Sequence, residues 1–428
     1  MGAPVAVIGG GGSGLLAAAA LRRAGVEFEL LEARDGVGGT WRYDEHGASS
    51  ACYESLVANT SKLRMAVGGR AIPGRPWEYA RHAEMLAYLE ELADAEDLRR
   101  SIRLGWRVEA ARPSGEDGDR WALTSSDGET RHYRAIVCAL GANGAPRFAE
   151  IPGRFSGEQM HSAAYRTPAR FAGRDVLVIG LGTSGAEVAG EVAGTARRVL
   201  VAVRDPLWMM TRRLGRLPLD WLDEPLAAHL LPWPVRRATL KTLSRLTTGR
   251  LHRLGLPRPT RRCGDDIVAI SDTFPKAVRA GLVEFRPGVA RAEGKTVTFT
   301  DGSSAEIDTI VHATGYEPPL GFLPDEAQPA TTGLYKAMVH PERDDLFFVG
   351  LFEAHHALLH IAEQQAAWTA DVLAGRLTLP APEERRRAVA EEAERRVQQF
   401  GDRRPFFLEW ATYNARLKRE RRRAPSTA

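Results

Sequence analysis

Two stretches of the chain carry small residues at a spacing that can bind the pyrophosphate of a dinucleotide. In the pattern G-x-G-x-x-G the first glycine permits a tight turn, the second leaves room for phosphate beside the backbone, and the third lets a helix pack closely on a strand. The free N–H groups and the dipole at the start of that helix then face the phosphates. The glycines and the serines between them are, in chain order, Gly9, Gly11, Ser13, Gly14, Gly180, Gly182, Ser184 and Gly185. The sequence therefore predicts two dinucleotide sites.

Each glycine stretch is followed by a charged residue that can select the nucleotide. Glu32 ends the strand after the first stretch, and its carboxylate can accept both hydroxyls of an adenosine ribose but would repel a 2′-phosphate. Arg204 takes the same place after the second stretch, where its guanidinium suits a 2′-phosphate. The neighbouring Asp205 counts against a strong preference, and an arginine merely exposed on the surface is the alternative interpretation. We expect the second site to bind NADP(H) rather than NAD(H).

Both sets of residues need a strand, a turn and a helix to position them, and the sequence supplies these elements twice. An apolar run at Val5 to Ile8 precedes the first glycines, and an alanine-rich helix and a strand at Glu27 to Leu31 follow them. Strands at 175–179 and 198–203 flank the second glycines and their helix. Two such repeats predict an α/β fold with two Rossmann-like domains.

Length and composition are those of an ordinary globular protein of two or three domains. The chain has 428 residues, of which 44% are hydrophobic and 26% charged. Its net charge of +4 is a small excess, so nucleic acid is not indicated. Three distant cysteines without a C-x-x-C pair indicate neither a disulfide framework, a zinc knuckle nor a redox dithiol. No run of about 18 apolar residues marks a transmembrane helix, and no signal peptide is evident, so we expect a soluble, cytoplasmic protein.

Three further segments carry residues that could serve a cofactor. Gly38 to Trp41 can run along a pyrophosphate and set an indole near a flavin, or form a turn with a packed tryptophan. The stretch 53–62 is too polar for a simple core strand, and Asn59 within it could hydrogen-bond a buried cofactor or cap a turn. Residues 206–262 read as helical, apolar and basic. They fit a flap over the active site whose cations lie in water, which we favour, or a peripheral contact with a membrane.

A cluster of histidines near the C-terminal third could form a metal site. His356, His360 and Glu363 share one helical face, and His355 is adjacent to it. We favour instead a helix that directs polar side chains at a cofactor ring, and we predict no metal. The role of His355, His356 and His360 stays open.

Breaks in hydrophobic periodicity indicate where the chain passes between domains. The pattern is lost at 141–153, and the strand and glycine turn at 309–316 would return the chain to the first domain. We assign 1–152 and 306–428 to one discontinuous domain and 153–305, which includes the segment 206–262, to the other. Within the first domain we expect a helix at Pro76 to Leu92.

The segment between the two repeats, Phe155 to Arg166, is similar to the F-x-G-x-x-x-H-x-x-x-Y-[KR] motif of flavin-containing monooxygenases. The resemblance runs from Val5 to about residue 380, nearly nine tenths of the chain. The second half looks like both bacterial members and the plant members that decarboxylate indole-3-pyruvate. Other segments similar to the family are Gly38–Trp41, Asn59–Lys62, Ala313–Tyr316 and Glu363–Trp368.

The resemblance implies FAD at the first glycine stretch, NADPH at the second, and a disulfide-reductase-like FAD-binding domain into which the NADPH-binding domain is inserted. It places Asn59 beside the flavin and the nicotinamide, and Tyr53 within reach of NADP. The residues that we expect to bind the two cofactors are Gly9, Gly11, Ser13, Gly14, Glu32, Arg34, Thr40, Trp41, Tyr53, Val108, Gly180, Gly182, Ser184, Gly185, Arg204 and Gln364.

The family also implies an NADPH- and O₂-dependent monooxygenase that inserts one oxygen atom into a small organic substrate through a C4a-(hydro)peroxyflavin. Asn59, as the catalytic residue, would shield that adduct from water together with retained NADP⁺. We favour N- or S-oxygenation. Baeyer–Villiger oxygenation or oxidative decarboxylation of a carbonyl substrate is the alternative, and a non-catalytic flavoprotein sensor is a remote one. A disulfide reductase would need paired cysteines that are missing, and formation of a homodimer is left open.

Three positions qualify the resemblance. Residues 65–70 replace the family's acid-aromatic-proline segment, and Ala139-Leu140-Gly141 replaces its usual A-T-G, so the geometry on the substrate side is left open. Baeyer–Villiger relatives carry Trp-Pro where Tyr165-Arg166 stand, which disfavours ketone oxygenation. We interpret His161 of the motif as structural or gating rather than catalytic.

Overall fold

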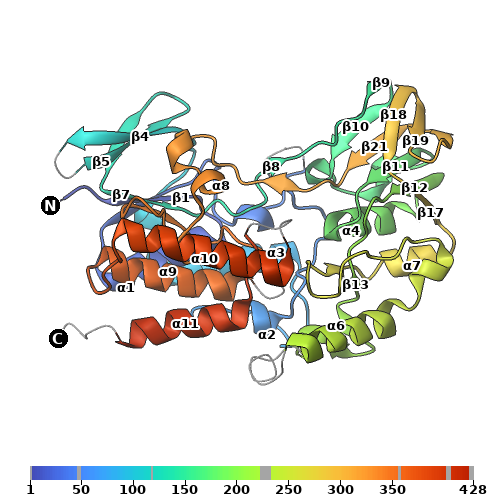
Figure 1. Ribbon diagram of the computed structural model, residues 1–428. Helices are drawn as coiled ribbons and strands as arrows, with labels where there is room; N and C mark the ends of the chain where they lie inside the picture. Colours follow the sequence, from blue (N-terminus) through green and yellow to red (C-terminus); the bar gives the residue numbers. More distant parts are fainter. Residues whose placement is uncertain are drawn as a thin grey trace. The chain divides into compact units, whose positions relative to one another are not determined.

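The computed structural model describes residues 2–45, 50–116, 119–221, 233–354, 358–401 and 406–423 (Figure 1). Within these residues the chain forms two compact units. The first unit comprises Met1–Arg42, Thr60–Gly144 and Pro318–Ala428. The second unit comprises Tyr43–Asn59 and Ala145–Glu317.

These units divide at 144/145 and 317/318, whereas the sequence analysis set the boundaries at 152/153 and 305/306. The larger difference is the segment 43–59, which belongs to the second unit. Side chains of that unit hold the segment by its backbone: Arg166 Nε donates to Asp44 O at 2.6 Å, and Arg212 Nε donates to Ala58 O at 3.2 Å. Contacts between residues so far apart in sequence leave no local pattern, so the segment could not be assigned from periodicity.

A parallel five-stranded sheet forms the centre of the first unit. Its central strands are short apolar runs that are almost wholly buried, as expected for parallel strands covered on both faces. The register pairs Ile8 with Leu31 on one side and with Cys138 on the other, so these strands end level at one edge of the sheet. In sheet order the strands are β23 (Leu346–Phe348), β7 (Ala135–Cys138), β1 (Val5–Ile8), β2 (Phe28–Leu31) and β3 (Ile102–Arg103).

The two faces of this sheet are covered differently. On one face, Ile8 and Cys138 pack in a cluster with Trp121 and Leu123 of a three-stranded antiparallel sheet. The opposite face carries α1 and α9, which pack against each other (Figure 1). The elements of these layers are β4 (Val108–Glu116), β5 (Asp119–Ser125), β6 (Thr130–Tyr133), α1 (Gly12–Ala24) and α9 (Leu358–Leu373).

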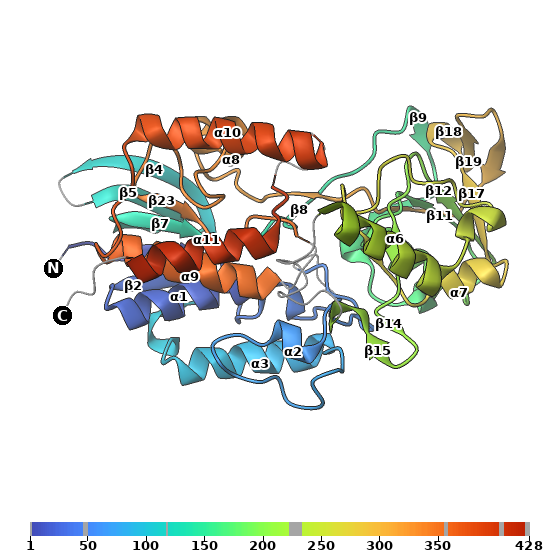
Figure 2. The same ribbon diagram turned by 60° about the horizontal axis from the view of Figure 1, so that its bottom comes forward.

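Further helices complete the first unit, and α11 packs alongside α9 (Figure 2). The predicted helix over 76–92 in fact begins later, because the carbonyls of Pro76 and Glu78 accept the N–H groups of Leu63 and Lys62 and cannot enter a helix. The remaining elements are α2 (Lys62–Met65), α3 (His82–Ala95), α8 (Pro329–Thr332), α10 (Pro382–Phe400), α11 (Trp410–Arg423) and short 3₁₀ helices at Gly39–Trp41, Arg99–Ser101 and Asp325–Ala327.

The second unit repeats this plan. It also has a parallel sheet, in which the last residues of two neighbouring strands, Ile179 and His312, pair with each other. Ile8 and Cys138 pair in the same way in the first unit. The strands of the sheet, in order, are β10 (Glu158–His161), β21 (Thr309–His312), β11 (Asp175–Ile179), β12 (Arg198–Ala202) and β17 (Val283–Arg286).

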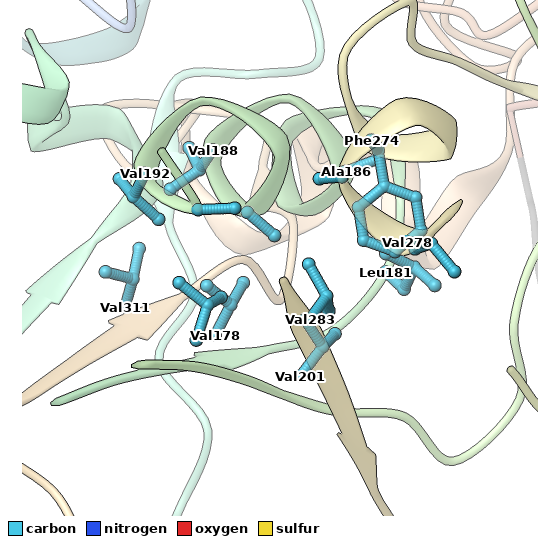
Figure 3. Packing of buried hydrophobic residues seen from close by; sticks show 14 of the residues in the cluster. Val178, Leu181, Ala186, Val188, Val192, Val201, Phe274, Val278, Val283 and Val311 are labelled. Atoms are coloured by element: carbon cyan, nitrogen blue, oxygen red, sulfur yellow. The ribbon is translucent and has the colours of Figure 1, made fainter. Parts of the chain in front are cut away.

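Helices cover one face of the second sheet and a small sheet covers the other. Figure 3 shows Val178 and Val311 of the strands beneath α4, and Val201 on the side of the cluster where Phe274 of α7 lies. The other elements of this unit are α4 (Thr183–Val192), α7 (Phe274–Arg279), β9 (Gly153–Phe155), β18 (Val289–Gly294), β19 (Thr296–Phe299), β20 (Ser304–Glu306), β8 (Ala145–Pro146), β22 (Tyr316–Glu317) and 3₁₀ helices at Ser162–Ala164 and Pro168–Phe171.

The segment 206–262 is only partly helical, which corrects the expectation from its composition. Gly215 has a positive φ of 62° that turns the chain between two short strands, so residues before 219 pair as strands and do not continue a helix. Residues 222–232 lie outside the described part of the chain. The described elements are β13 (Met209–Met210), β14 (Arg213–Leu214), β15 (Leu217–Pro218), α6 (Trp233–Thr248), 3₁₀ helices at Leu219–Trp221 and Leu251–Leu254, and β16 (Ala269–Ile270), which pairs with β13.

Candidate cofactor-binding sites

Close backbone contacts require the glycines of the first fingerprint. Gly9 has φ 105°, and a Cβ on Gly14 would lie 1.8 Å from Gly9 O. A Cβ on Gly39 would lie 2.7 Å from Gly11 Cα, so the two backbones touch. Helix α1 therefore starts close against the end of β1, and the N–H groups of its first turn form a cradle that fits a pyrophosphate.

Glu32 is fixed beside this cradle. Its side chain accepts two backbone N–H groups, from Gly10 to Oε2 at 2.6 Å and from Arg34 to Oε1 at 2.9 Å. The residue is 7% exposed. Because a carboxylate has about four acceptor positions, two of them remain for the hydroxyls of a ribose.

Arg34 links Glu32 to the turn at Gly39–Trp41. Its Nε lies 3.8 Å from Glu32 Oε1, and its Nη2 donates to Gly39 O. Among the described residues nothing accepts a hydrogen bond from Arg34 Nη1, which is buried. A buried donor without a partner is costly, so a ligand that supplies an acceptor there would be stabilised. The predicted residues Thr40, exposed, and Trp41, half-buried, follow on the same turn.

The helix that begins at the first cradle also faces the segment after β23. Gly350 has φ 83°, and a Cβ there would lie 2.1 Å from Ser13 Oγ. Gln365 of α9, fully buried, accepts the Gly350 N–H at 2.9 Å. The sequence analysis named the preceding residue, Gln364, which is half-buried, and missed Gln365. The available signal was a polar side chain four residues after Ile361 on the apolar face of this helix.

Two other residues of the first unit concern its surroundings, one predicted from the sequence and one not. Val108, half-buried at the start of β4, comes two residues after Trp106, whose N–H donates to Glu32 O at 2.9 Å. Lys62, which the sequence analysis did not single out, is 4% exposed and donates through Nζ to Pro73 O at 2.8 Å and to Glu84. This buried lysine holds the two ends of the loop that departs from the family pattern.

The second fingerprint has the same backbone geometry. A Cβ on Gly180 would lie 2.6 Å from Ala313 O, and a Cβ on Gly185 would lie 2.3 Å from Gly180 O. Gly182 precedes α4, and no atom of the described residues lies within 4 Å of a Cβ placed there. Ser184 is exposed in the first turn. The open helix start fits a second pyrophosphate.

Arg204 follows the end of β12 and is exposed. Its stem packs on Gly288, where a Cβ would lie 3.2 Å from Arg204 Cγ. Within the described part of the chain, its guanidinium makes no hydrogen bond or ion pair. Asp205 Oδ1 accepts the Thr260 N–H at 3.2 Å, so this carboxylate is directed to the backbone. An arginine without a carboxylate partner at this position fits the 2′-phosphate of NADP.

Asn59 lies in the second unit and is bound by an arginine that the sequence analysis did not identify. Arg212 Nη2 donates to Asn59 Oδ1 at 3.1 Å. Asn59 is exposed, whereas Arg212 is only 7% exposed. The interpretation that the cations of 206–262 lie in water is therefore wrong for Arg212. No sequence signal marked the pair, because the two residues are 153 positions apart.

The end of the sequence motif anchors the segment 43–59. The rings of Tyr53 and Tyr165 are 5.6 Å apart, and Tyr165 donates to Glu191 Oε2 at 2.7 Å. Burial, followed by the charges of Glu187 and Glu191, raises the pKa of Tyr53, so its phenol stays neutral. Arg166 donates to backbone carbonyls on both sides of the undescribed residues 46–49.

His161 and Glu363 both form hydrogen bonds with backbone groups. His161 Nε2 bonds to Gly315 O at 3.0 Å and Nδ1 accepts the Ala163 N–H at 3.1 Å, which supports a structural role. Glu363 Oε1 accepts the Gly68 N–H at 2.7 Å, and burial lowers the pKa of His360. His355 and His356 lie outside the described residues. No group of three potential ligands that could hold a metal occurs among the residues described.

A glycine cradle with a fixed carboxylate and a second cradle with an exposed cation define a protein that binds two different dinucleotides. A model of the flavin-binding monooxygenase-like family matches residues 2–413, and the chain belongs to this family. Human flavin-containing monooxygenase 5 is 30% identical over 401 residues, which cover 89% of this chain and 75% of that protein.

Solved structures of monooxygenases share the fold. The S-allyl-L-cysteine S-oxygenase from Allium sativum matches with a TM-score of 0.72 at 24% identity, over 98% of this chain and 88% of that chain. Cyclohexanone monooxygenase from Rhodococcus sp. Phi1 bound to NADP⁺ matches with a TM-score of 0.72 at 20% identity, over 97% and 96% of the two chains.

These findings confirm the predicted family, the two-domain Rossmann-like fold and the class of enzyme. The protein is a flavin-dependent monooxygenase, an oxidoreductase whose cofactors are FAD and NADP(H). None of the described helices is long and apolar enough to cross a membrane.

Proposed function

We propose that the enzyme oxygenates a nucleophilic nitrogen or sulfur atom of a small organic substrate, with FAD in the first cradle and NADPH in the second. FAD bound there would supply the redox chemistry: with two electrons from NADPH, one atom of O₂ would pass to the substrate and the other would leave as water. The protein residues position the cofactors: Glu32 holds the ribose of FAD, and Arg204 holds the 2′-phosphate of NADPH. Asn59 presents a fixed, exposed amide to the bound cofactors and helps to exclude water from the activated oxygen.

The bond from Arg212 to Asn59 is the observation that carries the role proposed for Asn59. An exposed amide side chain ordinarily rotates in water, but here a buried guanidinium donates to Oδ1 at 3.1 Å. A fixed polar group costs no reorganisation when charge develops nearby. An amide held in this way serves a bound ligand better than it serves a turn.

A cysteine nucleophile does not fit the structure. All three cysteines are buried, and none of them forms a disulfide. Burial raises the pKa of Cys138 and of Cys263, so neither is a ready thiolate. This arrangement argues against a thiol–disulfide relay and leaves the cofactors as the reactive groups.

Heteroatom oxygenation is favoured over attack on a carbonyl by residues 165 and 166. Baeyer–Villiger relatives carry Trp-Pro at these positions, whereas here Tyr165 and Arg166 bind Glu191 and backbone carbonyls of the segment 43–59. The S-oxygenase from Allium sativum, which shares the fold, is named for oxygenation of a sulfur atom. Ketone oxygenation or oxidative decarboxylation of a 2-oxo acid is the alternative.

Product analysis tests the proposal directly. The purified enzyme with NADPH and air is offered amines, thioethers, 2-oxo acids and ketones, and products are identified by mass spectrometry. We expect N-oxides or sulfoxides, and bleaching of the yellow enzyme by NADPH under anaerobic conditions. Products from carbonyl compounds alone would overturn the heteroatom assignment, and a flavin that NADPH fails to bleach would overturn the enzymatic one.

The substitution Asn59→Ala tests the role of the amide. We expect the variant to retain FAD but to convert most of the NADPH that it oxidises into hydrogen peroxide, because water reaches the activated oxygen. The ratio of peroxide formed to NADPH consumed measures this uncoupling. A ratio equal to that of the unmodified enzyme would remove Asn59 from the mechanism.

We also propose that residues 233–262 contact an anionic membrane surface. This stretch contains nine Lys and Arg residues and no Asp or Glu. Leu246 is 61% exposed and Leu254 is 49% exposed among these cations. Sedimentation with vesicles of phosphatidylglycerol, but not of phosphatidylcholine, is expected, and equal recovery with both would contradict it. The absence of disulfides among the three cysteines supports the cytoplasmic location that we propose.

A further inference from the structure

The buried side chain of Arg212 holds three consecutive residues, 57 to 59. Its Nε donates to Ala58 O at 3.2 Å, and its Nη2 donates to Val57 O at 3.4 Å and to Asn59 Oδ1 at 3.1 Å. Two of these bonds fix the backbone and the third fixes the side chain of Asn59. The segment is therefore held in position and in orientation by the same guanidinium.

Carboxylates on two other elements hold Arg212 itself. Asp272 Oδ2 accepts from Nη1 at 3.1 Å, and Asp272 Oδ1 accepts the Arg212 N–H at 2.9 Å. Glu187 of α4, 6% exposed, has Oε1 at 3.6 Å from Nη1. Burial lowers the pKa of Arg212, but Glu187 and Asp272 outweigh this effect and raise it, so the residue stays cationic. Since α4 begins at the second glycine fingerprint, this arginine connects Asn59 to the helix of that fingerprint.

The chemistry of arginine settles which way the amide of Asn59 points. A guanidinium has only donors, so the atom that faces it must be the amide oxygen and not the nitrogen. The NH₂ group of Asn59 then points away from Arg212, and Asn59 is exposed. A lysine could neutralise the carboxylates, but it lacks the planar fork that reaches three acceptors at fixed angles.

We propose that Arg212 is a positioning residue that presents the amide N–H of Asn59 as a hydrogen-bond donor to the bound cofactors. The inference rests on the proposed function of Asn59. It assigns a task to the segment 206–221 that neither the flap nor the membrane interpretation gives it: a buried cation there sets the orientation of the amide.

The first test compares Arg212→Lys with Arg237→Lys in the holoenzyme. Arg237 of α6 donates to Asp265 and does not contact Asn59, so it is the matched control. Hydrogen–deuterium exchange of the peptide covering 53–60 should be at least fivefold faster in Arg212→Lys and unchanged in Arg237→Lys. The fraction of NADPH converted to peroxide should rise at least fivefold in the first variant alone. Unchanged exchange in Arg212→Lys would overturn the proposal.

A second variant keeps the test decisive if Arg212→Lys does not fold. Asn59→Asp retains an acceptor for Arg212 but has no N–H to donate. We expect wild-type exchange of 53–60 together with the uncoupling of Asn59→Ala, and a coupled Asn59→Asp would overturn the donor role.

The double variant Arg212→Lys/Asn59→Ala separates action through Asn59 from independent action. We expect it to be no more uncoupled than Asn59→Ala, because Arg212 acts through that amide. Additional uncoupling would overturn the proposal. A fully coupled Asn59→Ala enzyme would overturn the proposed function of Asn59 and the donor role with it, whereas the exchange measurement would still report whether Arg212 holds the segment.

Discussion

The two glycine fingerprints share one backbone plan. In each, the third glycine is required because a Cβ would lie within 2.3 Å of the first glycine's carbonyl oxygen: 1.8 Å at Gly14 and 2.3 Å at Gly185. In each unit, the last residue of the strand before the glycines pairs with the last residue of a neighbouring parallel strand. These pairs are Ile8 with Cys138 and Ile179 with His312. The repeat thus extends from the turn into the sheet register.

The fingerprints differ in how the residue that we propose to recognise the ribose is held. Glu32 is buried and fixed by two backbone N–H groups, whereas Arg204 is exposed and makes no ion pair with any described residue. A carboxylate that must accept neutral hydroxyls gains from being oriented in advance. A guanidinium that must bind a doubly charged phosphate gains enough from charge alone to be ordered on binding. The backbone cradle is common to both sites, and we propose that selectivity resides in one side chain of each.

We expect the largest effect, a loss of folding stability, from substitutions at the third glycine of either fingerprint. Gly14→Ala and Gly185→Ala each force a backbone shift, so we expect a loss of about 4 kcal/mol or more in the free energy of unfolding. Gly182→Ala, whose Cβ would meet no described atom within 4 Å, should stay within about 1 kcal/mol. Thermal unfolding and the flavin content of the purified variants measure this, and similar losses for Gly182 and Gly14 would refute the distinction.

The next largest effect is the loss of stability at low pH, which we expect for the second unit and not for the equivalent position of the first. Burial lowers the pKa of His312 from 6.5 to about 4, and its Nδ1 accepts the Ala149 N–H at 3.2 Å, so the folded state favours the neutral ring. Because the folded pKa is depressed, stability is lost as pH falls from about 6.5 through 4, by about 3 kcal/mol at most. At the equivalent position, burial raises the pKa of the Cys138 thiol, which stays neutral over that range.

The variant His312→Asn is expected to flatten the acid side of the stability curve, measured by urea unfolding between pH 4 and 7. His132→Asn, at an exposed histidine of the first unit, is the control and should leave the curve as it is. An unchanged slope in His312→Asn would show that other groups set the acid sensitivity.

Removing the exposed cation should affect one coenzyme and spare the other. For Arg204→Ala we expect the KM for NADPH to rise about 30- to 100-fold, as the loss of a charge-assisted bond worth about 2–3 kcal/mol implies, and the KM for NADH to change less than about 3-fold. Arg245→Ala, another exposed arginine of the second unit, is the control. Equal changes for NADPH and NADH would contradict the phosphate role and favour the alternative that Arg204 is merely an exposed surface residue.

The comparison also shows which parts of the fold and of the sites could be predicted from the sequence. The glycine turns, the strands beside them and the residues Glu32 and Arg204 follow a local spacing rule, so each was identified by its offset from a glycine. The segment 206–221 was wrongly expected to be helical, because composition alone did not reveal that Gly215 turns a pair of short strands.

Residues that act through distant partners escaped the sequence analysis. Arg212 contacts Asn59 across 153 positions, and Gln365 accepts the N–H of Gly350 from the middle of a helix. Nothing in the neighbouring sequence distinguishes Arg212 from the other arginines of its segment. Only the burial of its side chain, together with the carbonyls of residues 57 and 58, marks it as part of a site.

The smallest effect concerns the fixed carboxylate, and it tests whether the orientation of Glu32 matters for FAD. In Glu32→Gln one amide oxygen can still accept an N–H, but the NH₂ group then faces the second backbone donor, which loses its partner. A lost bond of this kind costs about 1–2 kcal/mol, so we expect the affinity for FAD to fall about 10-fold while the KM for NADPH stays unchanged. Asp35→Asn, at an exposed carboxylate nearby, should affect neither quantity. Titration of the apoprotein with FAD measures the affinity. Retained affinity in Glu32→Gln would mean that the two backbone bonds serve the turn alone, and the contrast between an oriented carboxylate and an exposed cation would then lose its functional meaning.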